Sequence, residues 1–125
     1  MTQHFLSLAV FVTGLGAVTT PALSDDPRIE GIQTSRSGMG WRFDVTLSHP
    51  DTGWDHYADG WEVTTPDGKL LGARKLHHPH VAEQPFTRSL GRVSIPPGTD
   101  FIVVRARDSV HEYGGKEFRI DLPEN

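Results

Sequence analysis

Apolar and polar residues alternate along three stretches of the chain, with the period of two that is typical of a strand with one buried face. The clearest stretch covers residues 41–48, where Trp41, Phe43, Val45 and Leu47 alternate with polar residues. Residues 100–107 and 116–122 repeat the pattern, the former with many β-branched side chains. No stretch has a convincing apolar period of 3.6 residues, so the pattern predicts strands rather than helices.

Four weaker strands are predicted between and before these stretches, at residues 28–34, 61–65, 69–76 and 86–95. Turn sequences separate them, among them Pro66-Asp67-Gly68 and Pro96-Pro97-Gly98. In the stretch 86–95 the apolar positions change face between Leu90 and Val93. We therefore predict a β-bulge at Gly91, because a residue without Cβ tolerates the dihedral angles of a bulge.

Seven short strands with a turn about every ten residues are typical of an all-β, antiparallel β-sandwich. The pattern resembles the immunoglobulin and fibronectin type III folds, and Trp61 lies on the third strand, where such folds often bury a tryptophan. The resemblance covers the chain after its first 24 residues and rests on patterning. It implies a fold and no particular function. Because there is no cysteine, the resemblance favours fibronectin-like variants that have no disulfide between the sheets.

Length and charge narrow the classes of function. With 125 residues the chain is predicted to form a single domain. Its formal net charge of −4 comes from mixed signs without a basic stripe, which argues against nucleic-acid partners and anionic membrane surfaces. The absence of cysteine excludes thiolate metal sites, thiol nucleophiles and lipid attachment through cysteine.

The first 24 residues contain no charged side chain and are predicted to be a cleaved signal peptide. The apolar run from Phe5 to Val18 is too short for a membrane span, which needs about 20 residues. Cleavage is expected after Ser24, which leaves residues 25–125 as a periplasmic or secreted domain. The alternative is that the same run forms a buried strand or helix.

Histidine is the unusual feature of the composition, with seven residues. If consecutive strands run antiparallel, the connections after the second, fourth and sixth strands lie at one end of the sandwich. All histidines beyond residue 24 fall in these three connections. They are His49, His56, His77, His78, His80 and His111. Several acidic residues, including Asp51, Asp59, Asp108 and Glu112, lie in or next to the same connections.

This clustering predicts a transition-metal site for copper(II) or zinc. In His78-Pro79-His80 the proline favours an extended chain, so the two imidazoles point to one side. His56 and His111 could complete a set of three or four ligands. Possible additional ligands are His49, Asp55, His77 and Glu83, with His49 and His77 ranked as the weaker histidines. The alternative is that these histidines are only polar surface. Calcium is a weaker candidate, since histidine suits hard cations poorly.

Two further interpretations concern the same loops. Trp54, Tyr57 and Tyr113 could form a platform that binds a protein or a glycan in a non-catalytic recognition module. Alternatively, Trp54 and Tyr57 hold the long loop onto the end of the sandwich.

Asp108, Ser109 and His111 have the residue types of a nucleophilic triad. Neighbours at the end of one strand, however, cannot easily place the serine, the base and the orienting acid in one hydrogen-bonded line. We therefore expect no catalytic activity.

Overall fold

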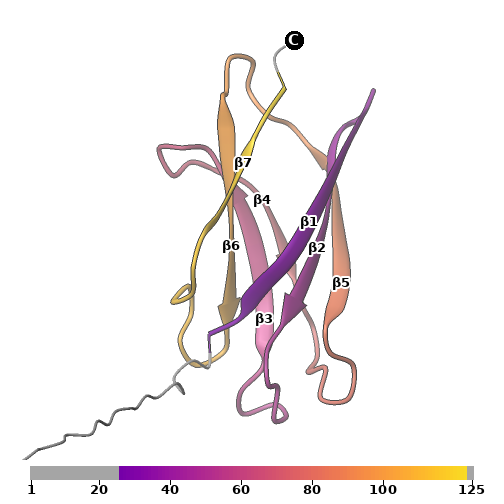
Figure 1. The fold of residues 1–125 in the computed structure, drawn as a ribbon, viewed down its shortest axis with the longest axis vertical. Coiled ribbons are helices and arrows are strands. Elements are labelled where there is room, and N and C mark those ends of the chain that lie inside the picture. The colour runs from indigo at the N-terminus through magenta and orange to yellow at the C-terminus, as the bar shows by residue number, and fades with distance from the viewer. Residues whose placement is uncertain (1–25, 124–125) are drawn as a thin grey trace, which may run out of the picture.

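The computed structural model describes residues 26–123, which form two packed antiparallel sheets (Figure 1). The strands are β1 (Arg28–Ser37), β2 (Gly40–Ser48), β3 (Ala58–Thr64), β4 (Leu70–Lys75), β5 (Phe86–Val93), β6 (Phe101–Asp108) and β7 (Phe118–Asp121). One sheet has the order β1-β2-β5 and the other the order β4-β3-β6-β7. The predicted seven-stranded, all-β sandwich is confirmed. The predicted signal peptide lies outside the described residues.

The inward-facing rows of β2, β3 and β6 form the core between the sheets. Buried side chains alternate along these rows as the sequence predicts. They are Phe43, Val45, Leu47, Trp61, Val63, Ile102, Val104 and Ala106. Trp61, predicted to be buried on the third strand, is 1% exposed. Trp41, also expected in the core, is half-buried and packs against its edge.

The predicted bulge is present in β5. Trp41 pairs with Val93 and Phe43 pairs with Leu90, so β5 has one residue more than β2 across this interval. The left-handed residue of the bulge is Arg92, with φ of 59°, rather than the neighbouring Gly91. The bulge restores the inward direction of Val93, which is 3% exposed.

The strand directions place three loops at one end of the sandwich, as predicted. The strands β2, β4 and β6 end there, and the loops 49–57, 76–85 and 109–117 follow them (Figure 1). Every histidine of the described residues lies in these loops. Within residues 26–123 there is no helix with the length and apolar character needed to cross a membrane.

Candidate metal centre

Two inward-facing rows of the core end in polar residues at this end of the molecule. The row Phe43-Val45-Leu47 of β2 continues to His49, and the row of Ile102, Val104 and Ala106 in β6 continues to Asp108. The side chains of His49 and Asp108 are both fully buried, and His49 Nε2 lies 3.5 Å from Asp108 Oδ2. Because β2 and β6 belong to different sheets, the two residues close the core between the sheets.

Asp108 is held as a buried carboxylate. Its Oδ1 accepts hydrogen bonds from the backbone N–H groups of Val110 at 2.8 Å and His111 at 2.5 Å. The His111 ring Nδ1 lies 3.0 Å from Oδ2. Burial raises the pKa of Asp108, but the hydrogen bonds from His111 and Val110 outweigh burial, so the pKa lies below its ordinary value. The site therefore has a fixed negative charge at neutral pH.

Asp51 orients the imidazole of His49. His49 Nδ1 lies 2.5 Å from Asp51 Oδ1, and both side chains are fully buried. The same carboxylate accepts the backbone N–H of Ala58 at 3.0 Å and that of His80 at 2.7 Å. Since a carboxylate only accepts, Nδ1 donates its proton to Asp51, and this contact orients the ring so that Nε2 faces Asp108. Carboxylates commonly orient metal-binding histidines in this way.

His56 approaches the same carboxylate from the 49–57 loop. A β-bridge between Gly53 and His56 folds this loop back on itself. His56 Nε2 lies 3.4 Å from Asp108 Oδ1, and its ring packs edge-on against His49 with the centroids 4.8 Å apart. We call His49, His56 and Asp108 the inner group. One ligand atom from each lies within 4.8 Å of the others.

The Nε2 atoms of His49 and His56 are buried and have no hydrogen-bond partner within the described part of the chain. An unsatisfied buried polar atom costs about 1–3 kcal/mol. Ligands bonded at about 2.0–2.1 Å to a tetrahedral zinc ion lie about 3.3 Å from one another. The distances of 3.4 and 3.5 Å from these nitrogens to Asp108 are close to that separation. The inner group could therefore hold a metal ion.

A second group shares Asp108 on the more exposed side of the site. His111 is 41% exposed in its side chain, and its ring centroid is 5.1 Å from that of His56. Ligand atoms of Asp26, Asp108 and His111 also lie within 4.8 Å of one another. We call these three residues the outer group.

The predicted ligand set of His56, His78, His80 and His111 is divided in two by the structure. His56 and His111 lie beside Asp108, whereas the rings of His78 and His80 lie beside each other with centroids 4.6 Å apart. Asp51 links His80 to His49, because its carboxylate accepts the backbone N–H of His80 and contacts the His49 ring.

His80 is buried in a setting of its own. Its ring stacks on Phe86 at 3.9 Å, and its Nε2 lies 3.0 Å from Arg88 Nη2. Burial, followed by the charges of Arg88 and His78, lowers the pKa of His80. A guanidinium against Nε2 opposes a cation at that atom.

The possible additional ligands have different positions. His49, ranked low by sequence reasoning, lies at the centre of the inner group. Asp55 and His77 are exposed, and Glu83 is exposed and pairs with Arg88 at 3.2 Å. Sequence reasoning noted Asp51 and Asp108 as acids at this end, but did not propose them or Asp26 as ligands. The sequence did contain a signal for Asp108 and His49, since each takes the next inward-facing position after the last apolar residue of a strand.

The three aromatic residues of the predicted platform are also divided. Trp54 is 67% exposed and packs edge-on against Tyr57, with centroids 5.6 Å apart. Tyr113 instead lies under the guanidinium groups of Arg105 at 4.4 Å and Arg107 at 5.4 Å. The exposure of Trp54 limits its part in holding the 49–57 loop to the sandwich.

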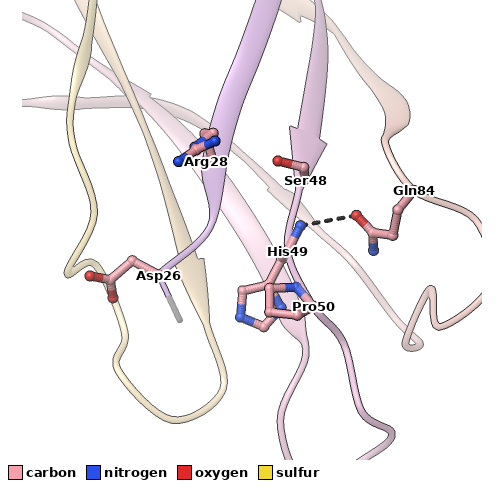
Figure 2. Close-up of a pocket in the computed structure, with 6 residues that line it drawn as sticks. All are labelled: Asp26, Arg28, Ser48, His49, Pro50 and Gln84. Atoms are coloured by element: carbon pink, nitrogen blue, oxygen red, sulfur yellow. Dashed lines mark hydrogen bonds between the residues drawn. The ribbon is translucent and has the colours of Figure 1, made fainter. Parts of the chain in front are cut away.

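A groove of about 350 Å³ passes beside the centre (Figure 2). It is lined by Asp26, Arg28, Ser48, His49, Pro50 and Gln84. Gln84 joins two of the loops, since its Oε1 accepts the His49 backbone N–H at 2.9 Å and its Nε2 donates to the His80 carbonyl at 2.8 Å. The groove gives solvent access to the side of the centre where Asp26 lies.

Comparison with known proteins found a relative of part of the chain. The chain is 46% identical over 87 residues to a protein of Halomicrobium mukohataei described as "Putative lipoprotein". The aligned part is 70% of this chain and 42% of that protein, so the chain spans less than half of its relative's length. The chain matches no protein-family model and no solved structure.

Proposed function

We propose that this chain is an exported β-sandwich protein that binds a transition metal ion, copper(II) or zinc, through His49, His56 and Asp108. The observation that carries the proposal is a pair of buried Nε2 atoms that have no hydrogen-bond partner among residues 26–123 and that both face one buried carboxylate. A bound cation would satisfy both nitrogens and neutralise charge on Asp108. The orientation of His49 by Asp51 supports the same role.

The chemistry of the donors supports copper(II) or zinc. Imidazole nitrogen suits both ions, and a carboxylate completes a set of the kind that zinc accepts. The sequence contains no cysteine, so it lacks the sulfur ligand that a blue-copper site or a thiolate zinc site requires. The proposed site therefore binds its metal ion through imidazole and carboxylate groups alone.

Export is supported by two independent observations. The uncharged, apolar start of the sequence resembles a signal peptide. The relative's description as a lipoprotein points to the same route, because lipoproteins are exported to the cell envelope. We propose a periplasmic or secreted location.

The experiment that tests metal binding is calorimetric titration of the purified protein with zinc and with copper(II). We expect a Kd below about 10 μM for at least one of them, equivalent to more than about 7 kcal/mol of binding free energy. The variant His56→Ala should weaken that affinity at least about tenfold, because it removes a ligand. His77→Ala is the matched control, since His77 is an exposed histidine at the same end.

A double variant, His78→Ala with His80→Ala, separates the two histidine pairs. If the inner group binds the metal, this variant should keep the affinity of the unchanged protein. Loss of binding in the double variant but not in His56→Ala would instead assign the metal to His78 and His80. Circular dichroism of each variant verifies that the sandwich remains folded. Failure of both metals to bind below about 10 μM would refute the proposal.

The exposed Trp54 favours a second candidate function, recognition of a protein or glycan by the same loops. A 67% exposed tryptophan beside Tyr57 offers a flat surface for stacking. The resemblance to fibronectin-like modules is in keeping with this role. Glycan-array binding by the unchanged protein that is lost in Trp54→Ala but retained in His56→Ala would support recognition over metal binding.

A further inference from the structure

We propose that Asp108 bridges two metal ions, one in the inner group and a second in the outer group of Asp26, Asp108 and His111. The second position rests on the proposed function of the inner group, because the two share a carboxylate. Its ligands are two carboxylates and one imidazole, a set suited to a divalent cation such as zinc.

The spacing of the ligand atoms supports two positions rather than one. They form two sets of three, each within 4.8 Å, that have Asp108 in common. His56 Nε2 approaches Asp108 Oδ1 at 3.4 Å and His49 Nε2 approaches Oδ2 at 3.5 Å, while His111 Nδ1 is about equally far from both oxygens, at 3.1 and 3.0 Å. Two ions that share one carboxylate lie about 3.5–4 Å apart, the usual separation in two-metal sites.

A pair of glycines leaves room for Asp26 in the outer group. A Cβ atom added to Gly114 would lie 2.8 Å from Asp26 Oδ1 and 3.5 Å from the His111 carbonyl oxygen. A Cβ atom added to Gly115 would lie 2.9 Å from the Pro27 carbonyl oxygen. Neither glycine has a positive φ, so the close approach of the chain before β1, rather than backbone conformation, accounts for the missing side chains.

The outer position differs from the inner one in its exposure to solvent. Asp26 is half-buried, and it lines the groove of Figure 2 together with His49 and Arg28. An ion held there would have one coordination position that water from the groove can occupy, because three protein ligands leave a tetrahedral ion one position short. The inner ion, between two buried imidazoles, would exchange more slowly with solvent.

The test is the number of zinc ions bound per chain, measured by native mass spectrometry and by calorimetric titration of the same protein. The unchanged protein should bind two. Asp26→Asn and Gly114→Ala should each bind one, the first by removing a charged ligand and the second by displacing the Asp26 carboxylate. Asp55→Asn is the control, since it removes an exposed acid at the same end of the molecule.

Copper(II) provides a second readout, because two ions bridged by one carboxylate couple magnetically. The electron paramagnetic resonance spectrum of the protein with two equivalents of copper(II) should show this coupling, and Asp26→Asn should abolish it. One zinc ion per chain that is retained in Asp26→Asn would overturn the bridge while leaving the inner group intact as a proposal. One zinc ion per chain that is lost in Asp26→Asn would overturn the bridge and assign the ion to the outer group instead of the inner one. Two ions retained in Asp26→Asn would also overturn it. Absence of any bound ion would refute the proposed function as well.

Discussion

His49 and Asp108 meet at the end of the core, with Nε2 of the first 3.5 Å from Oδ2 of the second. They come from opposite sheets, and each takes the next inward-facing position after a row of apolar side chains. A hydrophobic core that ends in a buried imidazole and a buried carboxylate needs compensation for both groups. Backbone hydrogen bonds provide part of it for Asp108, whereas His49 Nε2 has no hydrogen-bond partner among the described residues.

Replacement of Asp51 by asparagine should weaken metal binding without removing a ligand. The variant loses the carboxylate that orients His49, and such losses typically cost about 10–100-fold in metal affinity. The carboxylate of Asp51 accepts hydrogen bonds from the backbone N–H groups of Ala58 and His80. An asparagine would turn its NH₂ group toward one of these two donors and leave it unsatisfied, so we expect about 1–3 kcal/mol of lost stability. Competition with a zinc chelator and urea denaturation measure the two effects.

The control for this prediction is Asp55→Asn, which changes an exposed aspartate of the same loop. Unchanged zinc affinity in Asp51→Asn would show that His49 needs no carboxylate to act as a ligand. Equal effects in both variants would point to the net charge of the loop rather than to the contact with His49.

Zinc should raise the thermal stability of the protein. Free zinc at about 100 times its Kd stabilises the folded state by about 2.7 kcal/mol, provided that the unfolded chain does not bind it. For a domain of this size that free energy corresponds to a rise in Tm of about 10 °C or more. Differential scanning calorimetry with zinc, and then with excess EDTA, checks the size and the reversibility of the shift.

The variant His56→Ala should lose most of this stabilisation, whereas His77→Ala should keep it. A rise in Tm of the same size in both variants would mean that zinc acts somewhere other than the inner group.

Acid should destabilise the metal-free protein, in part through His80. Burial, Arg88 and His78 lower its pKa from the ordinary 6.5, and only the weaker effects of Glu83 and Asp51 oppose them. The unfolded chain therefore binds a proton at this residue before the folded protein does. Stability should fall as the pH decreases through about 6.5 and should level off below the pKa of the folded state.

Urea denaturation in EDTA at pH 8, 6.5 and 5.5 tests this pH dependence. In His80→Gln the loss of stability between pH 8 and pH 5.5 should be smaller than in the unchanged protein. An identical pH profile in the two proteins would show that His80 does not contribute to acid sensitivity.

Arg92→Gly should stabilise the sandwich slightly. A residue other than glycine with φ of 59° is strained by about 1–2 kcal/mol, and glycine removes that strain at a smaller entropic cost in the unfolded chain. We expect a net gain of up to about 1 kcal/mol in urea denaturation. Arg92→Ala keeps the Cβ atom and should give no such gain, so equal stabilities of the two variants would contradict a conformational origin.

From the sequence alone we could predict the strands, their inward faces and the end of the molecule at which the histidines lie. Period-two alternation is a local property of the backbone, so the buried faces of β2 and β6 could be assigned without knowing their partners. The bulge near Gly91 was predictable for the same reason, because it appears as a change of face within one strand. Antiparallel order then placed the loops 49–57, 76–85 and 109–117 together.

Only the tertiary structure decided which loop side chains converge. His78 and His80 point to one side as their spacing predicts, but stacking on Phe86 and contact with Arg88 hold His80 away from Asp108. The Gly53–His56 bridge turns His56 inward, and the glycines at 114 and 115 admit Asp26. These outcomes depend on loop conformations that are set by contacts between distant residues, and such contacts leave no periodic signal in the sequence.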